Sequence, residues 1–83
     1  MEIRQIQSFV TITQTGSFSG AAQLLGYSQS AITVQIRLLE EELGVRMFDR
    51  MGKTIGLTSQ GKRFLLCADE ILKQEQMAGE LKN

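Results

Sequence analysis

The spacing of apolar residues between Phe18 and Leu43 predicts two helices joined by a short turn. Residues three or four positions apart lie on the same side of a helix, so apolar residues at that spacing form a stripe that packs on a core. In the first helix this stripe consists of Phe18, Ala21, Ala22 and Leu25. In the second helix it consists of Ile32, Ile36, Leu39 and Leu43. Gly26 as the helix stop and Ser28 as the next N-cap leave a connection of only about three residues.

A second face of the later helix carries small, hydrogen-bonding or basic side chains. Ser30, Thr33, Val34 and Arg37 recur at positions i, i+3, i+4 and i+7, and Gln29 precedes them. An exposed helix with such a face is what a helix-turn-helix needs to read the major groove of DNA. The acids Glu40 to Glu42 would repel phosphates and suit a solvated helix end, so we expect only the N-terminal half to enter a groove. Periodicity alone slightly favours an ordinary helical hairpin in a small bundle.

The flanking segments predict another helix and a short β-hairpin. Residues 2–15 carry an inward stripe formed by Ile6, Phe9, Val10 and Thr13, with Ile3 beside it. Between residues 45 and 57, alternating apolar residues on both sides of Gly52 predict two antiparallel strands. Arg50 and Lys53 near the tip would equip a wing that grips phosphates or enters a minor groove. A solvated surface turn fits this segment equally well.

A long amphipathic helix is expected to begin after an N-cap at Thr58 or Ser59. One stripe has a seven-residue spacing and consists of Phe64, Cys67, Ile71, Ala78 and Leu81. A second stripe beside it consists of Leu65, Ala68 and Leu72. We expect one stripe to lie on the domain and the other to be free for a partner helix, which would make this segment a dimerisation helix. We assign dimerisation to the first stripe, with the seven-residue spacing.

Composition limits the function classes. The chain has 83 residues, no histidine and one cysteine, so it fits one small domain without an internal disulfide. Without histidine or a cluster of metal ligands, we expect neither an enzyme nor a cofactor. Cys67 lies in an apolar stripe without a neighbouring cation, so we expect a packed side chain rather than a redox sensor. No long apolar stretch or signal-like start predicts a membrane partner, and the lone cysteine fits a reducing cytoplasm.

The distribution of charge favours DNA more than its total does. The net charge is zero, which by itself opposes binding to nucleic acid. Residues 4–63, however, carry seven basic and four acidic side chains, whereas residues 64–83 carry two basic and four acidic ones. The modest positive excess therefore coincides with the segment that holds the candidate DNA-reading face.

The order of these residues resembles the N-terminal DNA-binding domain of LysR-type transcriptional regulators over essentially the whole chain. The shared landmarks are Phe9, Gly16, Ser17, Phe18, Ala21, Ala22, Leu25, Ser28, Gln29, Ile36, Leu39, Glu40, Leu43, Gly44, Phe48, Asp49, Arg50, Leu57, Thr58 and Gly61. The resemblance implies a mainly α fold, in which a winged helix-turn-helix of three helices and a two-stranded wing precedes a long linker helix. We therefore expect a DNA-binding domain over residues 1–58, with the helix-turn-helix at about 18–37, and a dimerisation helix over residues 59–83.

The resemblance also implies a bacterial, cytoplasmic regulator that binds double-stranded DNA as a homodimer at an inverted repeat. The recognition helix would enter the major groove and the wing would lie at the minor groove. Regulators of this family carry a C-terminal effector-binding domain, which would bind a small molecule and is absent from these residues. We therefore expect the chain to be part of a longer protein, with a tetramer as a further option for its full length.

The resemblance assigns base reading to four positions of the second motif helix. These are Gln29, Ser30, Thr33 and Val34. It assigns contacts near the DNA backbone or minor groove to Arg37, Arg50 and Lys53, to which we add Ser28 and Lys62, or Arg63, close to helix starts.

Two residues depart from the family pattern. Ser30 stands where proline is usual, and Val34 stands where a long polar or basic residue is common. Val34 offers only apolar contact, for example to a thymine methyl, so we predict that specificity depends more on thymine, groove width and Lys53 than in relatives. An unchanged preferred site after Val34→Arg would contradict this prediction.

Two alternatives stay open. A winged helix that binds protein would carry an apolar, acid-rimmed recognition face, against which Gln29, Thr33 and Arg37 speak. Molybdate-type regulators share the winged domain, and the full-length sequence would separate them from the LysR type.

Overall fold

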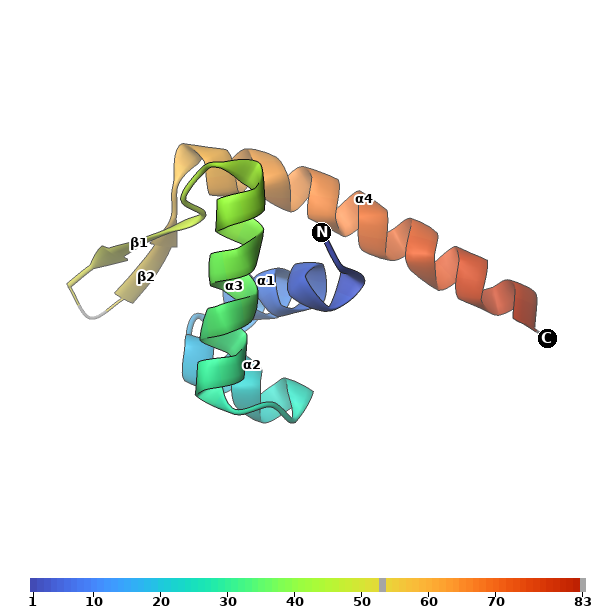
Figure 1. The fold of residues 1–83 in the computed structure, drawn as a ribbon, viewed down its shortest axis with the longest axis horizontal. Helices are drawn as coiled ribbons and strands as arrows, with labels where there is room; N and C mark the ends of the chain where they lie inside the picture. Colours follow the sequence, from blue (N-terminus) through green and yellow to red (C-terminus); the bar gives the residue numbers. More distant parts are fainter. Residues whose placement is uncertain (53, 83) are drawn as a thin grey trace.

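The computed structural model describes residues 1–52 and 54–82 of the chain. The elements follow in the order α1 (Ile3–Thr15), α2 (Phe18–Leu25), α3 (Gln29–Leu43), β1 (Phe48–Met51), β2 (Thr54–Leu57), α4 (Ser59–Gly79) and a 3₁₀ turn, η1 (Glu80–Lys82) (Figure 1). The predicted fold class is confirmed: the described chain is mainly helical, with one two-stranded wing before a long helix.

The helix boundaries follow from local capping. Ser17, Ser28 and Thr58 each accept a hydrogen bond from the backbone N–H three residues later, which satisfies a free donor at the start of α2, α3 and α4. Gly26 and Gly44 end α2 and α3 with φ values of 76° and 69°, which residues with a Cβ rarely adopt. The predicted turn of residues 26–28 is therefore confirmed.

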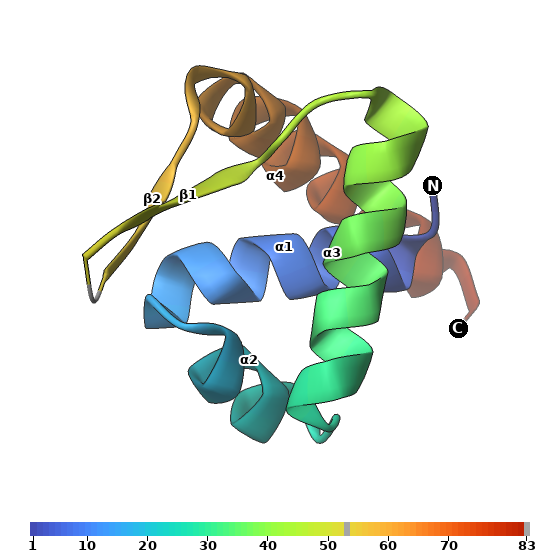
Figure 2. The same cartoon turned by 60° about the vertical axis from the view of Figure 1, so that its left-hand side comes forward.

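The core lies where α1 is covered by the other helices and by β1. Figure 2 shows α1 running behind α3, with α2 below and α4 above. The buried apolar residues are Ile6, Phe9, Val10, Ile12, Ala21, Ala22, Ile32, Ile36, Leu39, Met47, Phe48 and Ala68. Ile12 was not in the predicted stripe of α1, and it is buried because this helix contacts α2, α3 and α4 together.

The wing is an antiparallel pair in which Phe48 lies opposite Leu57 and Arg50 lies opposite Ile55. Gly52 takes a φ of 67° in the turn, while the predicted wing residue Lys53 lies outside the described residues. The Phe48 side chain is buried, and its ring centroid lies 5.3 Å from that of Phe9 and 5.6 Å from that of Phe18. The wing is thereby anchored to both α1 and α2.

Only the first part of α4 packs on the domain. Ala68 is fully buried, and Phe64, Leu65, Ile71 and Leu72 are partly buried against the core. Every described residue after Leu72 is exposed, and the helix extends away from the domain (Figure 1), giving extents of 46 × 26 × 20 Å. No described helix is long and apolar enough to cross a membrane.

The two predicted stripes of α4 are not separated as expected. Phe64 and Ile71, assigned to the free stripe, contact the core of their own chain, and the Phe64 ring lies 5.1 Å from the Phe9 ring. Cys67 is exposed, so the expectation of a packed cysteine is wrong for the single chain. Ala78 and Leu81 are also exposed. The domain covers parts of both stripes near the start of α4 because α4 packs against both α1 and β2.

Candidate nucleic-acid interface

The outer side of α3 exposes all five side chains that were predicted to face DNA. Gln29, Ser30, Thr33, Val34 and Arg37 are exposed, whereas Ile32, Ile36 and Leu39 on the opposite side are buried. We call the five exposed residues the reading face. Val34 keeps 43% of its surface exposed, which leaves its methyl groups accessible to a partner.

Hydroxyl groups on the reading face already have partners within the helix. The Thr33 Oγ1 donates to the backbone C=O of Gln29 at 3.1 Å. The Ser28 Oγ accepts from the N–H of Ala31 and lies 3.1 Å from the Ser30 Oγ. Because the Thr33 proton is used inside the helix, this side chain presents acceptor lone pairs and a methyl group outward. The main role of the Ser28 hydroxyl in this structure is to cap the N-terminus of α3.

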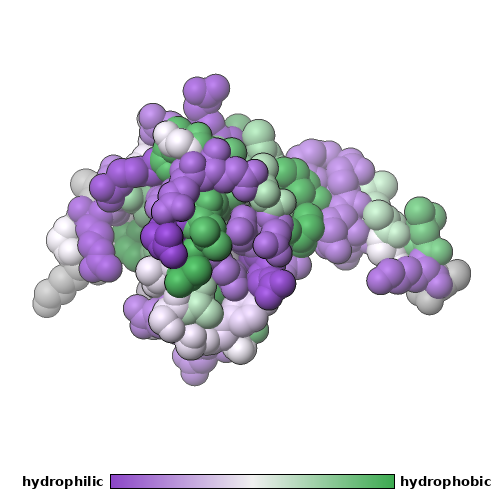
Figure 3. All heavy atoms as spheres, viewed as in Figure 1, coloured by the Kyte–Doolittle hydropathy of each residue, from purple (hydrophilic) through white to green (hydrophobic). Residues whose placement is uncertain are grey.

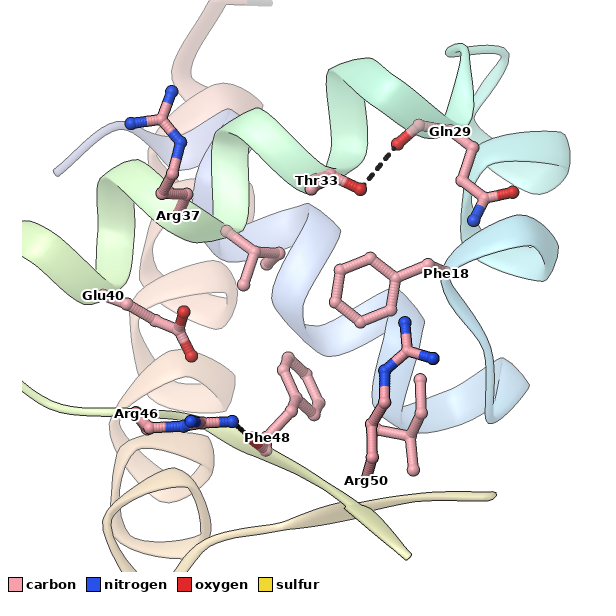
Figure 4. A pocket seen from close by; sticks show the side chains of 10 residues that line it. Phe18, Gln29, Thr33, Arg37, Glu40, Arg46, Phe48 and Arg50 are labelled. Carbon is pink, nitrogen blue, oxygen red and sulfur yellow. Dashed lines mark hydrogen bonds between the residues drawn. The ribbon is translucent and has the colours of Figure 1, made fainter. Parts of the chain in front are cut away.

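A groove of about 240 Å³ lies between the reading face and the wing. Its lining residues are Phe18, Gln29, Thr33, Ile36, Arg37, Glu40, Arg46, Phe48, Arg50 and Ile55. In Figure 4, Gln29 and Thr33 lie on the α3 side, whereas Arg46 and Arg50 come from the strand side and lie across the opening. The guanidinium of Arg37 points away from the opening. Positive charge from Arg50 on the wing, and from Arg46 just before it, therefore lies across the groove from the polar residues of the reading face.

Other predicted contacts lie outside this groove. Lys62 is exposed in the first turn of α4 and does not line the groove. Arg63 lines a different, largely apolar groove together with Leu43, Val45, Met47, Gln60, Phe64 and Cys67. The structure thus brings Gln29, Thr33 and Arg50 together and leaves Lys62 and Arg63 apart from them.

Sequence reasoning missed Arg46 as a groove residue. Its side chain is 76% exposed, with an Nη2 that donates to the C=O of Phe48 at 3.4 Å and lies 4.0 Å from the Asp49 carboxylate. Arg46 precedes β1, but it continues the every-second-residue spacing of Phe48 and Arg50, and side chains two positions apart in an extended segment share a face. This alternation was the available signal.

The charge of Arg37 is partly compensated in the free domain. Its Nη1 lies 3.0 Å from a carboxylate oxygen of Glu41, four residues later on the same helix. Both side chains are more than half exposed, and such pairs contribute only about 0.2–1 kcal/mol. A phosphate can therefore replace Glu41 as the partner of Arg37 with only a small loss of free energy from the broken ion pair.

Comparison with known proteins identifies the family. Residues 3–62 match the model described as "Bacterial regulatory helix-turn-helix protein, lysR family". The chain belongs to the LysR family of bacterial regulatory helix-turn-helix proteins. The HTH-type transcriptional regulator YtlI of Bacillus subtilis is 45% identical over 74 residues, which cover 89% of this chain and 24% of YtlI. The uncharacterised HTH-type regulator YwqM of the same organism is 42% identical over 72 residues, covering 87% of this chain and 25% of YwqM.

Solved structures agree with this LysR-family assignment over nearly the whole chain. The "Crystal structure of CbnR_DBD-DNA complex" matches with a TM-score of 0.91 and 36% identity, covering 99% of this chain and 94% of that one. The BenM_DBD complex with catB site 1 DNA matches with a TM-score of 0.90 and 34% identity, covering 99% and 93%. The predicted family and winged helix-turn-helix fold are confirmed.

The LysR-family domain spans about a quarter of the length of the curated relatives YwqM and YtlI. Both are named as transcriptional regulators, which supports a regulatory rather than an enzymatic protein. These names describe whole proteins, of which the matched residues form only one part.

Proposed function

We propose that this domain binds double-stranded DNA with sequence specificity, with the N-terminal half of α3 in the major groove and the wing at the minor groove. The observation that carries the proposal is the groove in which the polar reading face of α3 lies opposite the guanidinium groups of Arg46 and Arg50. A single duplex lying across both elements would present phosphates to the arginines and base edges to α3. Two similar domains are named as DNA complexes, which supports DNA as the partner.

Phosphate contacts would supply most of the affinity and the reading face most of the discrimination. Arg37, Arg46 and Arg50 grip the backbone, with Lys62 as an outer contact and Lys53 as a predicted wing contact, so binding weakens steeply as salt rises. Gln29 can bond the N6 and N7 edge of adenine in a bidentate way, which discriminates by about 1–3 kcal/mol. Thr33 accepts from a base amino group, while Ser30 and Val34 read neighbouring positions.

We also propose that two copies pair through α4, so that the target is an inverted repeat with half-sites about one helical turn, or a multiple, apart. The support is the exposed apolar surface at the far end of the chain, formed by Met77 and Ala78 of α4 and by Leu81 of the η1 turn. Figure 3 shows this end as a mostly hydrophilic arm with a hydrophobic group near its tip. Cys67 would face the partner, while Phe64 and Ile71 would support the interface from below.

The longer protein is proposed to be a cytoplasmic bacterial regulator with a C-terminal effector-binding domain. That domain would bind a small-molecule effector and would mediate assembly of the dimers into a tetramer, if one forms. The division into a DNA-binding domain of residues 1–58 and a dimerisation helix of residues 59–83 stays a prediction. The buried Ala68 packs α4 into the same core as the other helices. In this proposal α4 therefore contributes both to the core of the DNA-binding domain and to the dimer interface.

The deciding experiment is selection from a randomised duplex pool, followed by fluorescence-anisotropy titration of the selected and scrambled duplexes at two salt concentrations. Recovery of an inverted repeat, with affinity that falls as salt rises, is the expected result. Weak retention without sequence preference, unchanged after fusion to an artificial dimerising segment, would contradict the proposed function and favour a protein partner.

Removing thymine methyl groups tests the role of Val34. Replacing the thymines of the selected half-site by uracil is expected to weaken binding by about fourfold for each methyl group in contact, the equivalent of one buried CH₂. The Val34→Ala variant should show a much smaller difference in affinity between the thymine and uracil duplexes, because the valine methyl groups that contact the thymine methyl are gone. Uracil placed outside the half-sites is the control, and equal wild-type affinity for the uracil and thymine duplexes would contradict the prediction.

Neutralising Glu41 is expected to tighten binding. Glu41→Gln frees Arg37 from its 3.0 Å pair and removes a negative charge beside the phosphates, so affinity should rise roughly two- to fivefold at low salt. The gain should shrink at high salt, where exposed charges are screened. Glu75→Gln, in the extended part of α4, changes the net charge equally. Equal gains in both variants would show that only total charge matters.

A further inference from the structure

One residue, Glu40, binds three backbone N–H groups in the turn that follows α3. Its C=O accepts from Gly44 at 2.8 Å and from Val45 at 3.2 Å. Its carboxylate accepts from the N–H of Met47 at 2.7 Å. A hydrogen bond to an ionised carboxylate is roughly twice as strong as one between neutral groups. The side chain thus joins the end of α3 directly to the residue that precedes β1.

Met47 extends this connection to α4. Its side chain is fully buried, and its C=O accepts from the N–H of Thr58 at 3.0 Å. The Thr58 hydroxyl donates to the C=O of Arg46 at 2.5 Å and accepts from the N–H of Gly61 at 2.9 Å. A continuous set of hydrogen bonds therefore runs from α3 through the start of the wing to the first turn of α4.

We propose that Glu40 is a positioning residue that holds the reading face of α3 at a fixed orientation to the wing and to α4. The inference rests on the proposed function, because Arg37 on α3 and Arg46 and Arg50 on the strand side must contact one duplex together. If the connection loosens, each arginine still reaches a phosphate, but the base edges no longer meet the reading face at one register. Sequence discrimination therefore falls more than non-specific binding.

This role separates Glu40 from the two acids that follow it. The sequence indicated a solvated helix end for all three, and Glu41 and Glu42 are exposed. Glu40 is half-buried and lines the groove between Arg37 and Arg46 (Figure 4). A negative charge at this place is unfavourable for phosphate binding. The hydrogen bond from the Met47 N–H to the Glu40 carboxylate gives a structural reason for an acid at this position.

The test compares Glu40→Gln with Glu40→Ala, which remove the same charge. Glutamine keeps an oxygen that accepts from Met47, and alanine does not. In the absence of DNA, amide hydrogen exchange measured by NMR should show Met47 protected in wild type and Glu40→Gln, and about tenfold less protected in Glu40→Ala. The ratio of affinities for the selected and scrambled duplexes should fall by a similar factor in Glu40→Ala relative to Glu40→Gln, with equal non-specific affinity.

A second pair of variants covers the case in which Glu40→Ala fails to fold. Thr58→Val keeps nearly the same side-chain shape but removes the hydroxyl that hydrogen-bonds the Arg46 C=O and the Gly61 N–H. Thr58→Ser retains this hydroxyl. Thr58→Val should lower discrimination and Thr58→Ser should not. Equal protection of Met47 in all Glu40 variants, or equal discrimination by the alanine and glutamine variants, would overturn the proposal. If the wild type itself bound the selected and scrambled duplexes equally well, the proposed sequence-specific function would be contradicted instead. Amide exchange at Met47 is measured without DNA, so it tests the role of Glu40 independently of that function.

Discussion

Replacing Gly61 by alanine is expected to destabilise the domain by about 3 kcal/mol, the upper range for overpacking. A Cβ at this position would lie 2.2 Å from the backbone oxygen of Met47 and 3.0 Å from a methyl of Leu57. The oxygen belongs to main chain that bonds Thr58, so it cannot move without breaking that bond. The start of α4 must therefore shift away from the wing.

Urea unfolding followed by circular dichroism measures this effect as a lower midpoint at an unchanged slope. Gly79→Ala is the matched control in the same helix, because nothing lies within 4 Å of its added Cβ. Alanine is the better helix former, so this variant should change the free energy of unfolding by no more than about 0.5 kcal/mol, in the stabilising direction. Equal midpoints for the two variants would contradict the close approach at Gly61.

Replacing Phe9 by alanine is expected to lower the free energy of unfolding by about 3–5 kcal/mol. Its side chain is fully buried, and its ring contacts those of Phe48 and Phe64 at centroid distances of 5.3 and 5.1 Å. The three rings join α1, the wing and α4, so the cavity cannot close by movement of one element alone. Small domains have total stabilities of about 5–15 kcal/mol, and this loss would leave a large unfolded fraction near 37 °C.

Thermal and urea unfolding of the same variant provide the measurement. Leu24→Ala is the control, because Leu24 is 68% exposed on α2 and its truncation should change stability by about 0.5 kcal/mol or less. The Phe9 variant should also lose wing contacts first, visible as new chemical shifts in β1 and β2 before global unfolding. A Phe9→Ala loss as small as that of Leu24→Ala would show that the ring cluster contributes little.

The sequence by itself determined the features that depend on residues within about one helical turn. The caps at Ser28 and Thr58 and the helix stop at Gly26 need only neighbours three or four positions away. The two faces of α3 follow from the 3.6-residue period, which fixes relative directions along one helix whatever covers it. For the same reason the exposure of the reading face could be predicted before its surroundings were known.

Tertiary structure decided what covers each apolar face and which charges meet. Periodicity indicated two stripes on α4, but the packing of α4 against α1 and β2 determines that Phe64 and Ile71 contact their own domain and that Cys67 stays exposed. The placement of Arg46 at the groove and of Glu40 against Met47 likewise depends on how the wing folds back beside α3. Contacts across a fold are fixed by packing of whole elements, and a pattern along one element carries no information about its neighbour.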